Sequence, residues 1–405
     1  MSDYSTYILW ISSSPPYSKN STAGGQTFNY YFKNISRDKR FNVRLIALVD
    51  SKTKDSVENE MDGIPHKLVS SENSWKKFVN IDSKYNPWTK YSGLISNYRA
   101  MRILEEVKNY KKEGYNPDAV ILEWTNTVIL AKEIKKIFPD SKFVASEHDV
   151  TFVGYERKKE YYKGLKKLLW KIKYVNEKRI ELDSLKMCEL VLPHNADNRN
   201  VLVNEGIDLN KIMGLVPYYN NMSECNRNSN QKDILFFGAM ARMENSLSAL
   251  WFIDNVLPLL SDIDIRFVVL GSNPTEELKA KESERVHVTG FVDAVEPYFE
   301  KSMCLVAPLV LGAGIKVKVL EAMSSGIPVL TNDIGIEGIP AIDGRDYLHC
   351  VSPQEYASAI REIHNNKIDV KNLETNAKGM LKEHFSIEQS LHQYQDKLAN
   401  IGENI

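Results

Sequence analysis

The sequence predicts an α/β protein made of two doubly wound, Rossmann-like domains with parallel sheets. Short apolar runs typical of strands alternate with helical patterns along the whole chain, which indicates βαβ units. The 405 residues exceed one ordinary hydrophobic core and suit two domains of roughly 150–200 residues each. A polar, asparagine-rich stretch after Pro217 separates two series of strands and is typical of a linker.

The strand-like runs set the expected domain boundaries. We expect a first domain over residues 1–218, a linker over 219–232, a second domain over 233–386 and a helical segment at 387–405. Two doubly wound domains joined in this way form a cleft, and ligands bind where the carboxyl ends of the strands face it. The expected strands are Tyr7–Ile11, Val43–Val49, Ala119–Leu122, Lys142–Ser146, Leu190–Leu192, Met213–Val216, Asp233–Phe237, Arg266–Leu270, Val286–Thr289, Met303–Ala307, Pro328–Leu330 and Tyr347–Cys350.

The composition is that of a globular protein without a strong overall field. Hydrophobic residues make up 43% and charged residues 26%, and the net charge of −1 recruits neither nucleic acid nor membrane as a whole. The four cysteines are far apart and lack metal-binding spacing, as in reduced cytosolic proteins. The first residues lack the basic flank of a signal peptide, and no apolar run approaches the ~20 residues of a membrane span. We expect a cytoplasmic protein that does not bind nucleic acid.

The stretch LGAGIKVKVLEAMSSGIPVLTNDIGIEGI, residues 311–339, carries the clearest chemical signal. Gly312 and Gly314 let the backbone approach a ligand closely, and helical periodicity begins directly after them. The first amides and the positive dipole end of that helix therefore point at the loop. Lysines at the helix start, with Glu321 one turn deeper, suit a nucleotide diphosphate: cations for the pyrophosphate and a carboxylate for the ribose. Glycine-rich turns with solvated lysines also occur in α/β proteins that bind nothing there.

The whole pattern G-A-G-I-K-x-K-V-L-E-A-M followed by G-I-P-V resembles the signature of GT4-family retaining glycosyltransferases, which have the two-domain GT-B fold. The resemblance covers residues 233–363 and rests on scattered points before them. It implies that Glu321 is the second glutamate of an E-x7-E motif and grips the donor ribose. The first glutamate falls at Ala313, a departure that puts contacts to the donor sugar in doubt. It also implies that the helix at 387–401 crosses back to the first domain.

The resemblance implies further donor contacts. The turn after Gly238 has lost two family cations, because Ala239 takes the arginine position and Asn245 lies near the lysine position. We therefore assign phosphate neutralisation to Lys318, with Lys316 and Arg242 in support, although Arg242 also suits an ordinary surface arginine. The expected donor-binding residues are Gly24, Gly25, Gly238, Arg242, Phe291, Val292, Gly312, Ala313, Gly314, Ile315, Lys316, Lys318 and Glu321, with Glu337 and Gly338 close by.

We expect no metal and no cofactor beyond a nucleotide diphosphate sugar, a UDP-sugar in preference to a GDP-sugar. An Asp-x-Asp motif that could seat Mg²⁺ would have to end a strand, but Asp262–Asp264 precedes one. Similar enzymes neutralise the leaving diphosphate with helix dipoles and cations, which Lys318 and the glycine loop can supply.

On the acceptor side, Gly24 and Gly25 precede a helix whose Phe28, Tyr31, Phe32 and Ile35 share one face. By resemblance this pair approaches the transferred sugar; a plain turn is the alternative. His148 follows the Lys142–Ser146 strand, and the resemblance places it near the sugar or acceptor, which it would orient. Glu123, at the end of the preceding strand, is a second candidate. We take His148, Lys318 and Glu321 as the catalytic set, while a capped loop histidine is the competing interpretation of His148.

From Arg157 to Arg179, lysines and arginines outnumber acids and alternate with leucines and aromatics. This segment suits an anionic membrane surface or a polyprenyl-diphosphate acceptor, or it is a charged helix packed on its own domain. A second group of aromatics could stack on carbohydrate or cover the domain: Trp75, Phe78, Tyr85, Trp88 and Tyr91.

The sequence therefore favours a cytoplasmic retaining glycosyltransferase, peripheral at the inner face of the membrane, that moves a sugar from a nucleotide diphosphate to a hydroxyl. The acceptor would be a surface glycan or a lipid-linked or protein-linked molecule. Two alternatives stay open: a nucleotide-sugar epimerase or hydrolase, and a catalytically silent GT-B subunit that binds a glycan or a partner.

Overall fold

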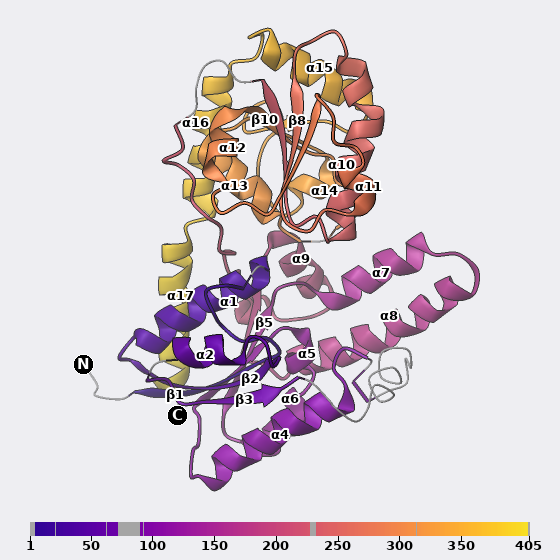
Figure 1. Cartoon of the computed structure of the whole chain (residues 1–405). Coiled ribbons are helices and arrows are strands. Elements are labelled where there is room, and N and C mark those ends of the chain that lie inside the picture. Colours follow the sequence, from indigo (N-terminus) through magenta and orange to yellow (C-terminus); the bar gives the residue numbers. More distant parts are fainter. Residues whose placement is uncertain are drawn as a thin grey trace. The chain divides into compact units, whose positions relative to one another are not determined.

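The computed structural model divides into two compact units, Met1–Tyr218 with Ile387–Ile405, and Tyr219–Ser386 (Figure 1). Each unit contains a six-stranded sheet, and every strand pair is parallel. The α/β class is thus confirmed. The residues that the structure describes are 5–20, 22–61, 63–71, 90–91, 93–226, 232–312 and 314–403.

The first unit alternates strands and helices and takes its last helix from the chain's end. Its elements are β1 (Thr6–Ser12), α1 (Ala23–Arg37), β2 (Phe41–Val49), α2 (Lys54–Glu60), β3 (His66–Ser70), α4 (Asn97–Lys112), β4 (Ala119–Glu123), α5 (Thr125–Val128), α6 (Ala131–Lys135), β5 (Lys142–Glu147), α7 (Thr151–Tyr161), α8 (Gly164–Leu185), β6 (Leu190–Pro193), α9 (Ala196–Asn204), η1 (Leu209–Lys211) and α17 (Ile387–Glu403).

The second unit repeats the alternation. Its elements are β7 (Asp233–Phe237), α10 (Met243–Asn255), η2 (Leu257–Leu260), β8 (Arg266–Leu270), α11 (Glu276–Lys279), β9 (Val286–Gly290), α12 (Glu296–Lys301), β10 (Ser302–Ala307), α13 (Val317–Ser325), β11 (Val329–Thr331), α14 (Asp333–Ile336), β12 (Leu348–His349), α15 (Pro353–His364) and α16 (Val370–His384).

Both sheets have the same topology. Their orders are β3-β2-β1-β4-β5-β6 and β12-β11-β10-β7-β8-β9, so the first strand of each unit lies in the middle. The chain winds outward on one side and then returns to wind outward on the other. Loops that follow the two central strands therefore diverge, and this opening is where doubly wound sheets bind ligands. The openings lie after β1 and β4 in the first unit and after β7 and β10 in the second.

Helix α1 shows how the sequence pattern becomes packing. Thr22 caps the helix by accepting a hydrogen bond from the amide of Gly25. The four residues expected on one face, Phe28, Tyr31, Phe32 and Ile35, are all buried in the core on one side of the sheet. Gly24 faces Trp124 and His148, which directly follow β4 and β5, so this packing places the start of α1 at the carboxyl ends of those strands.

The final helix, α17, packs on the first unit, as the resemblance implied. Leu391, Tyr394 and Leu398 are buried in the cluster that contains Ile8 and Trp10 of β1. A polar contact reinforces the apolar packing: the Tyr31 hydroxyl lies 2.7 Å from Ser390 Oγ and 2.9 Å from the carbonyl oxygen of Val216.

Some expected strands differ from the observed ones. Met213–Val216 is not a strand; it is an extended segment whose amides at Met213 and Leu215 donate to Val191 and Pro193. Strand β3 was missed because, at the sheet edge, it buries only Val69. Strand β11 begins at Val329, one residue later than expected, and β12 is only Leu348–His349.

The first part of the expected linker is packed against the second unit. The amides of Asn220 and Met222 donate to Glu321 Oε1, at 3.3 Å, and to Ser324 Oγ, at 2.9 Å. Met222 is buried, although the polar composition of this stretch suggested little to bury. Residues 227–231 lie outside the described part of the chain.

No helix among the described residues is both long enough and apolar enough to cross a membrane.

The packing of α17 predicts a specific loss of stability. Leu398→Ala should lower the free energy of unfolding of the first unit by about 2–4 kcal/mol, because it leaves a cavity under a fully buried side chain. Urea unfolding followed by tryptophan fluorescence would measure this, with the exposed neighbour Lys397→Ala as the control. Equal stability of the two variants would contradict the docking of α17.

Candidate functional site

The glycine loop of the second unit leads from β10 into α13 at the opening of the sheet. Gly312 and Gly314 have φ values of 143° and 73°, which side-chain-bearing residues rarely adopt. Lys316 stands at the N-cap, and its ammonium contacts the carbonyl of Gly314 and lies 3.5 Å from Glu337 Oε2. Because β10 and β7 are parallel neighbours, the loop and the start of α13 lie at the same end of the sheet as the turn after β7. Ala313 lies outside the described residues.

Lys318 is held from the turn after β7. Its ammonium donates to Asn245 Oδ1 at 2.7 Å and lies 4.8 Å from the centre of the Phe236 ring. Burial, and then the nearby cations Arg242 and Lys316, lower the pKa of Lys318 to about 7. Near neutral pH this amine therefore exchanges its proton readily, and an anion beside it would favour the charged form.

Asn245 has a larger part in the site than the sequence suggested. Its Nδ2 donates to the carbonyl of Ala239 at 2.9 Å, while its Oδ1 accepts from Lys318. A Cβ on Gly238 would lie 2.8 Å from Asn245 Nδ2, and Gly238 has a φ of 155°. Asn245 thus connects the glycine turn after β7 to Lys318 of α13. The spacing alone did not reveal this link.

Glu321 lies one turn into α13 and is only 6% exposed. Its carboxylate accepts the amide hydrogen of Asn220 at 3.3 Å. Burial raises the pKa of Glu321 to about 7, and the hydrogen bond from Asn220 opposes this increase. Near neutral pH the protonated and ionised forms of Glu321 therefore have similar free energies. Losing the proton costs little, and the resulting carboxylate can accept hydrogen bonds from hydroxyls.

Other expected donor residues lie at the margin of this cluster. Arg242 is exposed and pairs with Glu244 of its own turn, so it does not form part of the Lys318–Asn245 contact. Phe291 and Val292 follow the edge strand β9, and Phe291 is 76% exposed. Ile315 is partly buried in the loop before α13, and Gly338 follows Glu337 after α14.

The first unit has its own polar cluster at the end of β4, centred on Glu123. This buried carboxylate accepts hydrogen bonds from Trp10 Nε1 at 2.9 Å and from Ser146 Oγ at 2.7 Å. His148 Nε2 lies 2.6 Å from Glu123 Oε1. Burial raises the pKa of Glu123, and the hydrogen bond from Ser146 lowers it. Glu123 and His148, two separate candidates in the sequence, thus form one pair.

His148 lies between two rings, nearly parallel to Trp124 and tilted by 41° from His194. It stacks on Trp124 with ring centres 4.7 Å apart, and its centre is 4.0 Å from that of His194. Burial lowers the pKa of His148, so its imidazole is neutral at physiological pH. With Nε2 donating to the carboxylate, Nδ1 is an acceptor, and Nδ1 is the atom that would lie 3.0 Å from a Cβ on Gly24.

His194 was missed in the sequence. It directly follows β6, which is the same signal that identified His148 after β5, and its Nε2 lies 3.2 Å from Ser146 Oγ. Glu123, His148 and His194 offer ligand atoms within 4.8 Å of one another, a set that could hold a metal ion such as zinc. In the described structure Glu123 and His148 are 2.6 Å apart, so these two side chains are hydrogen-bonded directly to each other.

The two glycines of α1 have separate packing reasons. Gly24 faces His148 and Trp124, whereas a Cβ on Gly25 would lie 2.1 Å from Asn20. The glycine pair is therefore not a plain turn: both residues belong to α1, and each allows a close side-chain contact.

The expected aromatic group is only partly described. Trp75, Phe78, Tyr85 and Trp88 lie outside the described residues, and Tyr91 is buried in the core of the first unit. Tyr91 is thus a core residue, and stacking of the other four aromatics on carbohydrate stays a hypothesis.

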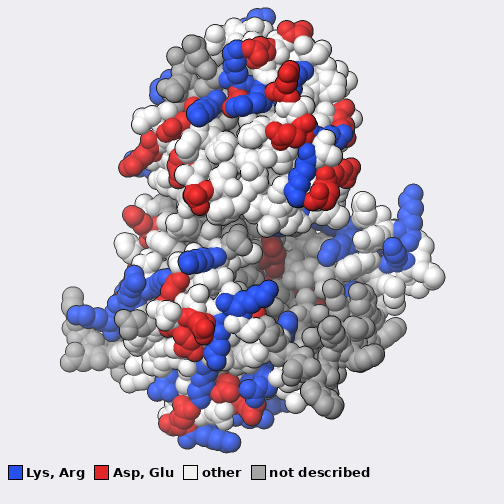
Figure 2. Space-filling view, in the orientation of Figure 1, with Lys and Arg blue, Asp and Glu red and all other residues white. Residues whose placement is uncertain are grey.

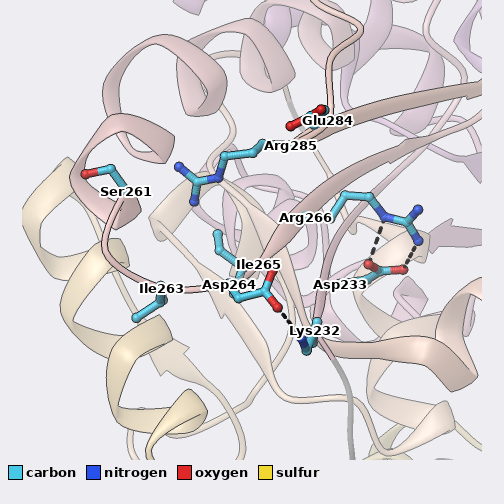
Figure 3. Close-up of a pocket in the computed structure, with 9 residues that line it drawn as sticks. All are labelled: Lys232, Asp233, Ser261, Ile263, Asp264, Ile265, Arg266, Glu284 and Arg285. Carbon is cyan, nitrogen blue, oxygen red and sulfur yellow. Dashed lines mark hydrogen bonds and ion pairs between the residues drawn. The ribbon is translucent and has the colours of Figure 1, made fainter.

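A hollow in the second unit lies at the opposite end of the sheet, at the amino ends of β7 and β8 (Figure 3). Its lining holds three cations and three carboxylates: Arg266 bonds both carboxylate oxygens of Asp233, Lys232 contacts Asp264, and Arg285, near Glu284, donates to the carbonyl oxygen of Leu260. Because these charges neutralise each other, we assign the hollow no ligand.

The contact between Gly24 and His148 predicts the effect of one added methyl group. Gly24→Ala should displace the imidazole of His148, which ¹⁵N NMR of histidine-labelled protein would detect as changed Nδ1 and Nε2 shifts. Gly379→Ala in α16 is the matched control, because its Cβ meets nothing within 4 Å and should stabilise the helix by up to about 1 kcal/mol. His148 signals unchanged by Gly24→Ala would refute the placement of His148.

Comparisons with known proteins agree with this fold. HepE of Anabaena in complex with UDP-glucose superposes with a TM-score of 0.65 at 13% identity, covering 97% of this chain and 99% of that one. A glycosyltransferase from Rickettsia africae gives 0.62 at 15% identity, with 99% and 100% covered. Sucrose-phosphate synthase from Thermosynechococcus elongatus gives 0.66 at 13% identity, also with 99% and 100% covered.

The sequence comparisons are narrower. No curated protein matches the chain by sequence. Residues 231–366, which include Lys318, Asn245 and Glu321, match the family model described as glycosyl transferases group 1. Over residues 231–366 the second unit is thus similar in sequence to group 1 glycosyltransferases, and the chain as a whole has the GT-B fold.

Proposed function

We propose that this protein is a retaining glycosyltransferase that moves a sugar from a nucleotide diphosphate donor to an acceptor hydroxyl. The observation that carries the proposal is the cluster of Lys318, Asn245 and Glu321 at the opening of the second sheet. A cation, a helix start and a buried carboxylate one turn apart complement a diphosphate joined to a ribose. The UDP-glucose bound to HepE, which has the same fold, supports a UDP-sugar as donor.

Each residue would have a distinct part in donor binding. Lys318 and the start of α13 would face the diphosphate, with Lys316 close by, and Glu321 would accept hydrogen bonds from the ribose hydroxyls. Negative charge builds on the leaving diphosphate during transfer, so a prepositioned ammonium stabilises the transition state more than the ground state. These groups would allow transfer without a metal ion.

His148 would orient the sugar or the acceptor. Its neutral ring is fixed by Glu123 and Trp124, and its acceptor atom Nδ1 is directed at the start of α1. A hydroxyl that donates to Nδ1 would be held in one direction. In a retaining reaction of this type the leaving phosphate assists deprotonation of the acceptor, so His148 positions the hydroxyl and need not remove its proton.

The acceptor would be a hydroxyl of a surface-glycan, lipid-linked or protein-linked molecule. We place the reaction in the cytoplasm, at the inner face of a membrane, with peripheral contact through residues 157–179. The exposed leucines of α8 support this location.

A catalytically silent GT-B subunit remains the second candidate. Ala239 replaces one family cation, and Arg242 pairs with Glu244 in the same turn. A site with fewer cations for the diphosphate binds nucleotide more weakly, which is what this alternative requires. An epimerase or hydrolase would instead consume the donor without an acceptor.

Calorimetric titration of the full chain with UDP, GDP, ADP and their sugar conjugates, with and without Mg²⁺, tests the proposal. Tight binding of one nucleotide without metal is expected. The absence of binding to all of them would favour the silent subunit.

Removing the charge of Glu321 tests its assignment. Glu321→Gln should weaken nucleotide binding by about tenfold or more, because an amide accepts hydrogen bonds from ribose hydroxyls less strongly than a carboxylate does. The amide can still accept from Asn220, so the fold should survive. Glu276→Gln on the exposed face of α11 is the control. Equal nucleotide affinity in both variants would contradict the donor site.

Nucleotide binding should also change the protonation of the site. At pH 8 Lys318 is largely neutral, and a diphosphate would raise its pKa, so binding should take up about one proton. At pH 6 Glu321 is largely protonated, and ribose donors would lower its pKa, so binding should release protons.

Titration in two buffers of different ionisation enthalpy measures the sign of this proton exchange at each pH. Nucleotide affinity should decline as pH rises above about 7, because the ammonium form of Lys318 is lost. Proton release at pH 8 would show that Lys318 does not face the diphosphate.

A further inference from the structure

Helices α7 and α8 form a hairpin that projects from the first unit (Figure 1). The two helices are joined by aromatic contacts around Trp170, which meets Tyr155 edge-on at 5.2 Å and stacks on Tyr162 at 6.2 Å. Lys158 and Lys173 each lie within 5 Å of the same indole centre. The hairpin is therefore held together by its own side chains.

The base of the hairpin is fixed as well. The carboxylate of Glu181, fully buried in α8, accepts hydrogen bonds from the amides of Thr151 and Phe152, at 3.0 Å and 3.1 Å. These two amides begin α7, so the carboxyl oxygens of Glu181 satisfy the first free amides of that helix. A hairpin fixed at the base and stiffened along its length presents its far end in a defined orientation.

The far half of α8 exposes an apolar stripe. Leu165, Leu168 and Leu169 are 81%, 54% and 49% exposed, and Val175 is 55% exposed. With the partly buried Ile172 they are spaced i, i+3, i+4, i+7 and i+10, so they lie along one helix face. Tyr161, at the end of α7, adds a further exposed ring at 69%. Such a continuous apolar face on a helix normally marks an interaction surface.

Lysines flank this stripe. Lys163, Lys166, Lys167 and Lys171 are all exposed, and Lys167 lies 3.5 Å from Glu160. In Figure 2 the projecting end of the hairpin shows blue side chains beside uncharged ones. Cationic heads beside exposed leucines complement a surface that is anionic outside and apolar beneath.

We propose that the end of the α7–α8 hairpin, residues 161–175, docks on an anionic phospholipid bilayer. The leucines and Tyr161 enter the interface between headgroups and acyl chains, and the lysines contact lipid phosphates. Nucleic acid fits this surface less well, because the centre of the patch is aliphatic. A protein partner would cover the leucines but does not account for the cations around them.

The docked hairpin would bring the protein to the surface that holds a lipid-linked acceptor. Only this link to the acceptor rests on the proposed function. Lipid docking and donor binding can fail separately, since they concern different residues. Vesicle binding measured without nucleotide, and nucleotide binding measured without vesicles, keep the two results apart.

Cosedimentation of the full chain with phosphatidylcholine vesicles, with and without 30% phosphatidylglycerol, tests the proposal. We expect binding to the anionic vesicles that weakens as salt rises. The double variant Leu165→Glu/Leu168→Glu should reduce it by at least about tenfold, since two apolar anchors are lost and two anions added. Lys166→Ala/Lys171→Ala should reduce the preference for anionic over neutral vesicles.

Met101→Glu on α4 is the matched control, because Met101 is also exposed, at 65%, on a helix of the same unit. It should bind vesicles like the unchanged protein. All variants should bind nucleotide alike, which excludes misfolding.

Three outcomes would overturn docking: no binding to anionic vesicles, an equal loss in Met101→Glu, or a dimer in solution that Leu165→Glu/Leu168→Glu dissociates while vesicles are not bound. The last result would assign the stripe to contact between copies of the chain.

Discussion

The position of the first strand in the middle of each sheet is the constraint on which the rest of the structure depends. Because β1 and β7 have parallel neighbours on both sides, the loops after them turn away from those after β4 and β10. Backbone amides, glycine turns and helix starts are thereby brought together at one edge of each sheet. Lys318 and Glu321 in one unit, and Glu123 and His148 in the other, occupy these edges.

Desolvation gives both clusters the same electrostatic character. Burial lowers the pKa values of Lys318 and His148 and raises those of Glu321 and Glu123, so each group lies closer to its neutral form than it would in water. The unliganded protein therefore avoids the free-energy cost of fully charged groups away from solvent. A ligand of opposite charge can restore the ionised form of the side chain that it contacts. Affinity therefore depends on how well the ligand's charges and hydrogen-bonding groups match these side chains.

Much of the framework could be predicted from the sequence, because apolar periodicity reports directly on burial. The central strands and the buried face of α1 followed from it, and the glycine loop followed from its motif. Partnerships between distant residues could not be predicted. Asn245 with Lys318, and His194 with Ser146, depend on which strands become neighbours. Edge strand β3 buries too little to leave a periodic signal, and the docking of α17 was inferred only by resemblance.

The docking of α17 has a consequence for synthesis on the ribosome. Ile8 and Trp10 are made before the second unit, whereas Leu391, Tyr394 and Leu398, which cover them, are made after it. At about 5–20 residues per second, the nascent first unit waits tens of seconds for its final helix. The second unit is complete in sequence before then, so it can fold first. Until α17 is made, the growing chain exposes an aromatic surface of the kind that chaperones recognise.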